Sequence, residues 1–328
     1  MPTSHLTRGY ILAVISAALL STTAIFIRYL TETFALPALV LACWRDGFVA
    51  LTLLVVLGLS RPALLRLPTR RDAKSCVSTS GNKYRVSTPV FIVCYALVLA
   101  VFNSLWTLSV AINGAAVSTV LAYCSAGFTA LLGRWFLKEE LGWGKLLAVG
   151  FSLAGCVLVA GAHDPQVWQT NLLGLLTGIG TGLLYAIYTL LGRSASQRGL
   201  NPWTTILYTF ALASVFLLGF NLLGGGWLPG AAARPADLFW LGQAWQGWLV
   251  LFVLAAVPSL LGFGLYNSSL IYLPSSVANL VVTLEPVFTA VIAYFLFGEV
   301  LDGIQLLGSG LILTGVVVLR VVEGRGKT

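Results

Sequence analysis

The chain alternates between long apolar runs and short polar connections. Ten of the runs are about 20 residues long, which is the length of helix that crosses the hydrocarbon core of a bilayer. They span residues 8–29, 37–59, 89–111, 115–136, 142–161, 173–192, 203–223, 246–272, 275–297 and 302–321. Because the runs lack the alternation of barrel strands, and because a spanning segment must satisfy its own backbone in lipid, the pattern predicts ten transmembrane helices.

The composition agrees with this prediction. Hydrophobic residues make up 58% of the 328 residues and charged residues 9%, and the mean hydropathy is +0.92, whereas about 25% of a soluble domain is charged. The sequence therefore predicts an all-α polytopic membrane protein whose apolar surface is buried in the lipid bilayer. The net charge of +8 comes mainly from the polar connections, where it sets topology and does not predict binding of nucleic acid.

The basic residues are distributed unequally between the two sides. With a cytoplasmic N-terminus, sixteen Lys and Arg fall inside, and only Arg28 and Arg234 fall outside. The positive-inside rule therefore predicts a multi-pass protein of the plasma (inner) membrane with both termini in the cytoplasm. The long basic connection at residues 60–88 is interpreted as a flexible cytoplasmic loop, with a phosphoinositide or partner site as the alternative.

The second half of the sequence repeats the first. A shift of 165 positions aligns Arg28 with Arg193, and a shift of 160 aligns Phe128 with Phe288. Because each copy holds five helices, an odd number, the second copy must cross the membrane inverted, as in many secondary transporters. We therefore predict a first repeat at 1–162, a linker at 163–172 and a second, inverted repeat at 173–328.

The fifth and tenth predicted helices carry glycines, which have no side chain, at corresponding positions. Gly150 and Gly155 align with Gly310 and Gly315, and small residues allow membrane helices to approach closely. Because these two helices lack deep polar groups, we expect them to lie at the periphery or to form a homodimer contact.

Three charged residues lie well inside the predicted spans: Arg45, Asp46 and Glu285. A charge at this depth costs about 2.5–3.5 kcal/mol on insertion scales, so each should face the bundle interior and have a partner. Arg45 and Glu285 lie at similar predicted depths, so Arg45 either pairs with Glu285, binds a substrate carboxylate, or serves as a structural tie. Asp46 points about 100° away from Arg45 around the helix, which predicts a different partner for it.

Glu285 is followed by Pro286 in the middle of an apolar run. A proline there removes a backbone donor and frees the carbonyl of Val282, which predicts a kinked or hydrated helix. Transporters place such interruptions at their binding sites. The first copy has Ser125 and Ala126 at the aligned positions, so the sequence predicts that the two halves differ here.

Aromatic and amide side chains gather near the same depth. Any one of them is explained by ordinary helix packing, but together they suit a planar, apolar or amphipathic solute. The predicted substrate-binding residues are Trp44, Arg45, Asn103, Trp106, Tyr123, Tyr185, Tyr188, Tyr266 and Asn267. The predicted coupling or gating residues are Asp46, Glu285 and Pro286.

Motifs for other chemistries are missing from the sequence. It has no GxxxxGK[ST] phosphate-binding loop, no HExxH and no CxxC, and its two histidines, His5 and His163, lie near the ends of the apolar segments. We therefore predict no metal, no cofactor and no enzymatic activity.

The pattern resembles a known family. Ten helices in two copies, the segments LKEEL (137–141) and FGEVL (297–301), and Pro286 after Glu285 are similar to the drug/metabolite transporter superfamily, and within it to EamA-domain exporters such as the YddG-type amino acid exporters. The resemblance covers nearly the whole chain. It implies export of small metabolites, often amino acids.

The leading hypothesis is a secondary transporter that exports small metabolites, amino acids or related amphipathic solutes, by alternating access around a midplane cavity. In this hypothesis Glu285 or Asp46 carries a coupling proton; a facilitator without coupling is the alternative. Two other functions fit the sequence: a membrane solute sensor or scaffold that does not transport, and an exporter of drug-like organic cations.

Overall fold

The computed structural model describes residues 3–66, 87–138, 142–159, 172–225, 227–297 and 302–325. Within these ranges the chain forms helices and no β-strand. Most of the basic connection at 60–88 and of the linker at 163–172 lies outside the described residues, as do residues 139–141 of LKEEL and 298–301 of FGEVL.

The helices fall into two halves with the same number of crossings. The first half contains α1 (Thr3–Thr33), α2 (Ala38–Ser60), α4 (Thr88–Asn113), α5 (Ala115–Ala122), α6 (Ser125–Leu137) and α7 (Trp143–Val159). The second contains α9 (Leu172–Gln197), α10 (Pro202–Leu223), α11 (Trp245–Leu254), α12 (Leu260–Ser269), α13 (Ser275–Val282), α14 (Glu285–Phe297) and α15 (Gly303–Arg325). The pairs α5–α6 and α13–α14 each form one crossing interrupted by a turn, and α11–α12 forms one crossing interrupted by the π-helical turn Ala255–Ser259. Five crossings therefore make each half.

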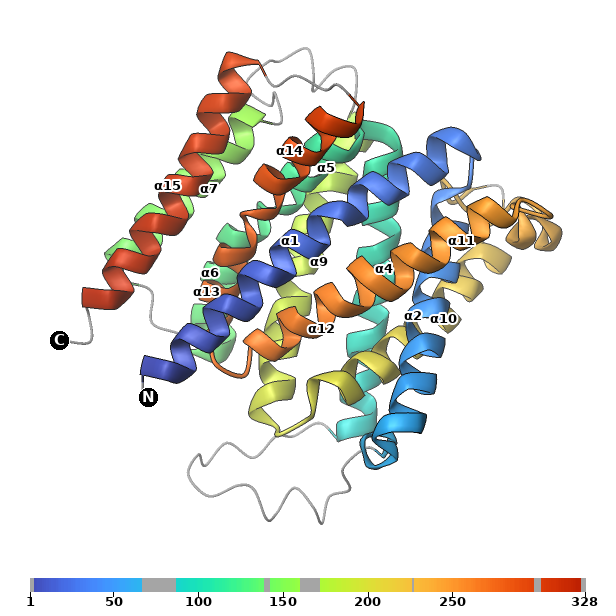
Figure 1. Cartoon of the computed structure of the whole chain (residues 1–328), viewed down its shortest axis with the longest axis horizontal. Coiled ribbons are helices and arrows are strands. Elements are labelled where there is room, and N and C mark those ends of the chain that lie inside the picture. Colours follow the sequence, from blue (N-terminus) through green and yellow to red (C-terminus); the bar gives the residue numbers. More distant parts are fainter. Residues whose placement is uncertain are drawn as a thin grey trace.

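The outer surface of the bundle suits lipid. Seven helical segments in the described ranges are long and apolar enough to span a bilayer, and α5–α6, α7 and α15 occupy the three other predicted spans. Large apolar side chains face outward, including Leu59, Trp143 and Leu223, each more than 80% exposed. The helices form one bundle (Figure 1). The all-α polytopic fold with two repeats of five crossings is as predicted.

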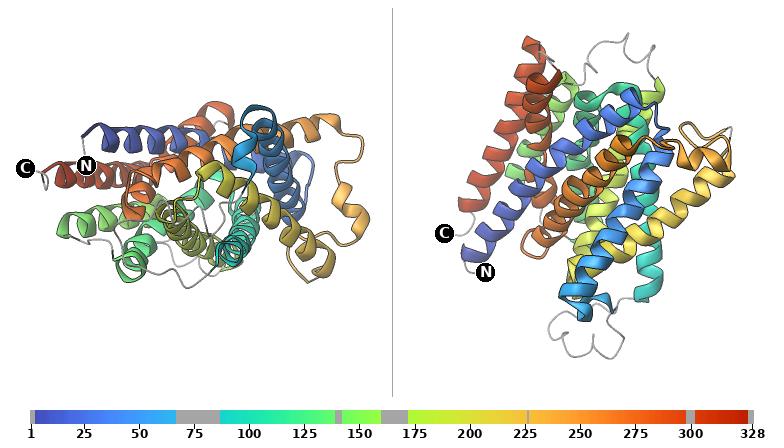
Figure 2. Two further views of the ribbon diagram at one scale, coloured as in Figure 1. Left: turned by 90° about the horizontal axis from the view of Figure 1, so that it is seen from below. Right: turned by 45° about the vertical axis from the view of Figure 1, so that its right-hand side comes forward.

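Two pairs of helices form opposite sides of the bundle, and helix α1 lies between them. Helices α7 and α15 pack mainly on each other at one edge, while α2 and α10 lie together on the far side of the bundle (Figure 1 and Figure 2). Helix α1 runs between them, and the Ser16 hydroxyl donates to the carbonyl of Gly262 on α12 at 2.8 Å. The Thr289 hydroxyl of α14 donates to the carbonyl of Ser21 at 3.0 Å, which ties α1 to both interrupted crossings of the second half.

The edge pair α7–α15 is held by two of the four aligned glycines. A Cβ added to Gly155 would lie 2.5 Å from the carbonyl oxygen of Gly308, and one added to Gly315 would lie 2.7 Å from that of Ala148. No atom lies within 4 Å of a Cβ added to Gly150 or Gly310. Close packing within the chain is therefore found at Gly155 and Gly315, while the space beside Gly150 and Gly310 is open. The homodimer contact through these two helices stays a prediction.

Replacing Gly155 with Ala is expected to destabilise the protein by about 1–3 kcal/mol, because the new methyl group would force α7 and α15 apart. Gly150→Ala on the same helix is the matched control, and it should be neutral or stabilising by up to about 1 kcal/mol, since Ala favours a helix more than Gly does. Thermal unfolding of the two variants in detergent measures the difference. Equal stability of the two would contradict the packing described.

Two of the interrupted crossings break at aligned positions. In the first copy, the N–H of Cys124 donates to the carbonyl of Leu121 at 3.2 Å, and in the second the N–H of Leu284 donates to that of Val281 at 3.2 Å. Both are short turns between two helices that continue in the same general direction. The two breaks are therefore the same structure, repeated 160 positions apart.

The helix geometry predicted at Pro286 needs correction, whereas its gating role stays a prediction. The proline does not kink a continuous helix; it lies in the first turn of α14, just after the break, where a missing N–H is tolerated. The first copy breaks without a proline, and there the N–H of Ala126 donates to the carbonyl of Tyr123 at 3.0 Å. The backbone difference predicted between the halves is small, and the main difference is chemical, because Glu285 stands where the first copy has Ser125.

Candidate functional site

A pocket lies between the two breaks and the neighbouring helices. Its empty space, part of which is open to the surroundings, is about 360 Å³. The residues that line it come from both halves: Leu20, Thr23, Phe102, Trp106, Ala122, Tyr123, Tyr185, Phe263 and Glu285. Four of them, Trp106, Tyr123, Tyr185 and Glu285, belong to the set predicted from the sequence.

Glu285 is the acidic group of this pocket. It is the first residue of α14 and is 5% exposed, and its Oε2 accepts a hydrogen bond from the hydroxyl of Tyr123, which lies in the break of the other half. Close by, the hydroxyl of Ser125 on α6 donates to Oδ1 of Asn279 on α13 at 3.0 Å. The two breaks are thus joined to each other by side chains across the repeat.

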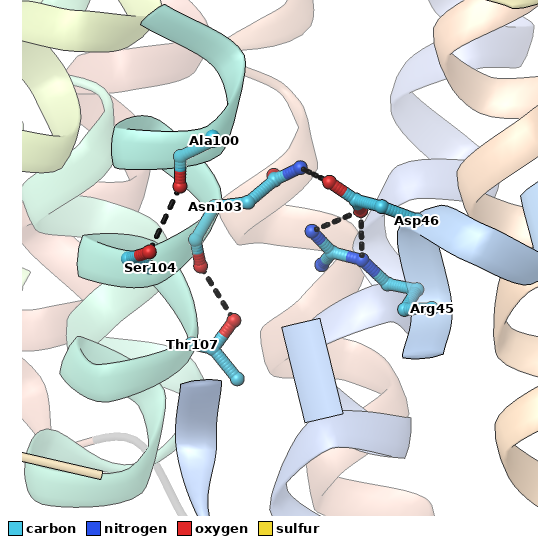
Figure 3. A network of polar contacts seen from close by, with 6 residues as sticks. All are labelled: Arg45, Asp46, Ala100, Asn103, Ser104 and Thr107. Carbon is cyan, nitrogen blue, oxygen red and sulfur yellow. Dashed lines mark hydrogen bonds and ion pairs between the residues drawn. The ribbon is translucent and has the colours of Figure 1, made fainter. Parts of the chain in front are cut away.

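Arg45 does not pair with Glu285. Its Nε and Nη2 each lie 3.2 Å from Oδ1 of Asp46, and Oδ2 of Asp46 accepts from Nδ2 of Asn103 on α4 at 2.6 Å (Figure 3). All three residues are at most 1% exposed. The predicted separation of Arg45 from Asp46 was wrong because a long guanidinium side chain can fold back along the helix, so the angle between Cβ directions does not decide the pairing.

This triad lies outside the pocket lining. The positive charge of Arg45 is compensated by its neighbour Asp46, and Asn103 links that pair on α2 to α4. The arrangement fits the interpretation of Arg45 as a structural tie. The Oδ1 atom of Asn103 is buried without a hydrogen-bond partner among the described residues.

Trp44 also lies away from the pocket. Its Nε1 donates to the carbonyl of Leu238 at 2.6 Å, in the connection between α10 and α11. Its ring packs against those of Phe48, Phe239 and Trp248 at centroid distances of 5.6, 5.5 and 5.1 Å. The side chain therefore joins α2 to the connection on the predicted external side.

Tyr188 and Asn267 form a hydrogen-bonded cluster with Tyr95. Nδ2 of Asn267 on α12 donates to the Tyr188 hydroxyl on α9 at 2.8 Å, and its Oδ1 accepts from the Tyr95 hydroxyl on α4 at 3.2 Å. Asn267 lies one helical turn after Phe263, a residue of the pocket lining, and it borders a second, smaller pocket of about 180 Å³ nearer the end of α9. The cluster therefore lies one helical turn from the central pocket, toward the end of α9 that is predicted to be cytoplasmic.

Tyr266 belongs to a third polar cluster beside the pocket. Its hydroxyl lies 2.7 Å from Oγ1 of Thr189, to which Nδ2 of Asn279 also donates at 3.3 Å. The ring of Tyr266 lies 5.7 Å from that of Tyr185. The cluster connects α9, α12 and α13 directly behind the pocket wall.

The chemistry of the pocket follows from its lining. Five aromatic rings surround one carboxyl group, and no Lys, Arg or His lines the pocket in the ranges that the structure describes. Aromatic faces and a carboxylate both attract a cationic group. No group of His, Cys, Asp or Glu suited to a metal ion occurs among the described residues.

Five lining residues are not in the predicted set: Leu20, Thr23, Phe102, Ala122 and Phe263. Phe102 had a usable signal, since it lies four residues before Trp106 and so shares its helix face. Thr23 and Phe263 are single residues in apolar runs. No pattern in a single sequence identifies such residues as part of a pocket.

Comparisons with known proteins place the chain in a family. A model of the EamA-like transporter family matches residues 7–161 and again residues 172–321. An uncharacterized transporter of Archaeoglobus fulgidus is 28% identical over 224 residues, 67% of this chain and 74% of the relative. The uncharacterized transporter YyaM of Bacillus subtilis is 24% identical over 278 residues, 84% of this chain and 82% of the relative.

A solved protein crystal structure has the same fold. It superposes with a TM-score of 0.68 and 16% sequence identity, and the match covers 96% of this chain and 98% of that chain. Two matches to one family model, together spanning most of the sequence, agree with the repeat found in the sequence and in the fold. The chain belongs to the EamA-like transporter family.

Proposed function

We propose that this membrane transporter exports small amphipathic solutes that carry a protonated amine, amino acids and related metabolites among them. The observation that supports the proposal is Glu285, a buried carboxyl group enclosed by aromatic rings in a pocket that both halves line. An ammonium group would bind the carboxylate, and an apolar or aromatic side chain would pack on the rings.

The proposed mechanism is alternating access in the plasma (inner) membrane, with both termini in the cytoplasm. The two breaks meet at the Tyr123–Glu285 hydrogen bond, so an ammonium group that binds Glu285 competes with Tyr123 and loosens the contact between the halves. The Tyr95–Asn267–Tyr188 cluster would open to release or admit the solute on the cytoplasmic side.

A second candidate is an exporter of organic cations without a carboxylate. It is favoured by one observation: no base lines the pocket in the described part of the chain, and the guanidinium of Arg45 is paired with Asp46 outside it. A free amino acid carboxylate would then lie near Glu285 without a positive partner, which costs free energy.

Counterflow in proteoliposomes tests both candidates. Vesicles loaded with unlabelled L-phenylalanine or 2-phenylethylamine should accumulate the same labelled compound from outside, because a transporter exchanges its substrate. Exchange of the amine without the amino acid would select the organic-cation candidate. Binding of either compound, seen as a rise in melting temperature, without any exchange would contradict transport and support the sensor alternative.

A further inference from the structure

Two hydrogen bonds tie helix α1 to the second half of the bundle. The hydroxyl of Ser16 on α1 donates to the carbonyl of Gly262 on α12 at 2.8 Å, and the hydroxyl of Thr289 on α14 donates to the carbonyl of Ser21 on α1 at 3.0 Å. Ser16, Ser21 and Thr289 are fully buried. Each bond joins two different helices, so it forms only while those helices keep their present positions.

The repeat relates each partner in these bonds to a residue of α9, α4 or α6. Under the shifts of 165 and 160 positions, the counterparts of the four residues above are, in the same order, Thr181, Phe102, Thr129 and Ala186. By the symmetry of the repeat, the hydroxyl of Thr181 would donate to the carbonyl of Phe102. The hydroxyl of Thr129 would donate to the carbonyl of Ala186.

Neither counterpart bond is formed in this structure. The hydroxyl of Thr181 donates instead to the carbonyl of Thr177, one turn earlier on its own helix, at 2.7 Å. The hydroxyl of Thr129, a fully buried residue, bonds to nothing in the described part of the chain. A buried hydroxyl without a partner costs free energy. The Thr129 hydroxyl therefore destabilises this conformation relative to a methyl group.

The helices that would carry the missing bonds already lie side by side. The ring of Phe102 on α4 stacks on that of Tyr185 on α9 at a centroid distance of 5.4 Å. A Cβ added to Gly182 on α9 would lie 3.2 Å from the backbone nitrogen of Ser125 on α6. Thr129 follows Ser125 by one turn, and the carbonyl expected to accept from it follows Gly182 by one turn. A shift of α6 along α9 would therefore be enough to form the bond.

We propose that these bonds alternate during the transport cycle, an inference that rests on the alternating access proposed above. In this conformation α1 is tied to α12 and α14. In the conformation that faces the other side of the membrane, α9 is tied to α4 and α6 instead. The reason is the repeat: two copies of one fold cross the membrane in opposite orientations, so a contact made by one copy in one state is available to the other copy in the opposite state. Thr129 is then a positioning residue that stabilises only the second state.

Replacing each hydroxyl with a methyl group tests the proposal. Thr289→Val removes a bond of the present conformation and should move the population toward the opposite one, whereas Thr129→Val should move it the other way. Each shift should be about fivefold, which corresponds to one hydrogen bond of about 1 kcal/mol. In the double variant each state loses one bond, so the two shifts should cancel.

The population is measured with Ala122→Cys, which adds a cysteine to the lining of the central pocket. A membrane-impermeant methanethiosulfonate is applied to right-side-out and to inside-out vesicles, and mass spectrometry follows labelling at this position apart from the native cysteines. The ratio of the two labelling rates reports which side the pocket faces. Thr129→Ser and Thr289→Ser keep the hydroxyl and should keep the ratio, as should Thr209→Val, whose hydroxyl bonds to Thr205 within α10.

The outcomes separate this inference from the proposed function. If the added cysteine is labelled from both sides and the two valine variants leave the ratio unchanged, or move it in the same direction, the alternating bonds are wrong and the proposed function stands. If labelling occurs from one side only in every variant, alternating access fails and the alternating bonds fail with it.

Thermal unfolding without any reagent gives an independent check. Thr289→Val should lower the melting temperature by about 2–4 °C, because it removes a buried hydrogen bond. Thr129→Val should not lower it, because the hydroxyl that it removes has no partner in this conformation. An equal fall in both variants would show that the Thr129 hydroxyl is already bonded, which overturns the proposal.

Discussion

Replacing Glu285 with Gln is expected to weaken binding of an amine solute by about 100-fold or more. Gln keeps the size of the side chain and can still accept a hydrogen bond from Tyr123, but it removes the negative charge that would bind the ammonium group. Losing one partner of a buried, hydrogen-bonded charge pair costs about 2–5 kcal/mol, and 100-fold corresponds to about 2.7 kcal/mol. Calorimetric titration with 2-phenylethylamine, the probe with the simplest chemistry, measures the loss.

Glu32→Gln is the matched control for this variant. Glu32 lies on α1, its side chain is 60% exposed, and it pairs with Arg28 at 2.8 Å. Because its charge is far more accessible to solvent than that of Glu285, the Glu32–Arg28 pair contributes little to the stability of the protein. Its replacement should leave binding within about twofold of the wild type. Wild-type affinity in Glu285→Gln would remove the central observation behind the proposed function.

The same variant addresses proton coupling. If Glu285 carries the coupling proton, an imposed pH gradient should drive counter-transport in wild-type proteoliposomes and have no effect on whatever exchange Glu285→Gln retains. A response that persists in the variant would exclude Glu285 and leave Asp46 as the other deep carboxyl group. A wild type that ignores the gradient would be a facilitator.

The fold could be predicted from the sequence because lipid imposes strong rules on a chain. Apolar length fixed the crossings, and an odd number of helices per copy required the inversion. The break at Tyr123–Cys124 could not be predicted, since neither Ser125 nor Ala126 disrupts a helix as proline does. Tertiary contacts, which one sequence does not show, lie next to the break, among them the bond from Ser125 to Asn279 on α13.

Part of the candidate site could also be predicted, because the length of an apolar run gives the depth of each residue in the bilayer. Depth along a helix correctly placed Trp106, Tyr123, Tyr185 and Glu285 at one level of the bundle. Depth does not determine which way a side chain points, so Trp44, Arg45 and Asn103 were predicted in the pocket although their side chains contact other groups. The direction of a side chain depends on which helices pack beside it, and a single sequence does not show which helices are neighbours.

Replacing Asp46 with Asn is expected to destabilise the protein by about 3–5 kcal/mol. The change leaves the guanidinium of Arg45 buried at 1% exposure without its carboxylate partner, and an uncompensated buried charge costs about this much. The loss should appear in thermal or denaturant unfolding of the purified protein. It should be accompanied by a lower yield of folded protein, because a few kcal/mol is a large part of the stability of most proteins.

A double variant distinguishes the missing charge from other damage at this site. Arg45→Met with Asp46→Leu removes both charges, and replacing a whole buried ion pair with apolar residues is often neutral or stabilising. We therefore expect the double variant to recover most of the stability that Asp46→Asn loses, although Asn103 loses its acceptor on α2. Removing the exposed pair with Arg28→Gln and Glu32→Gln should cost less than about 1 kcal/mol.

The double variant also tests function, because it separates the role of the Arg45–Asp46 pair from that of Glu285. A double variant that regains stability and still binds 2-phenylethylamine would show that Arg45 and Asp46 are not needed for binding, and leave substrate recognition to the Glu285 pocket. If stability returns but binding does not, Arg45 or Asp46 takes part in recognition, as the sequence alone had predicted. Wild-type stability in Asp46→Asn would contradict the buried ion pair itself.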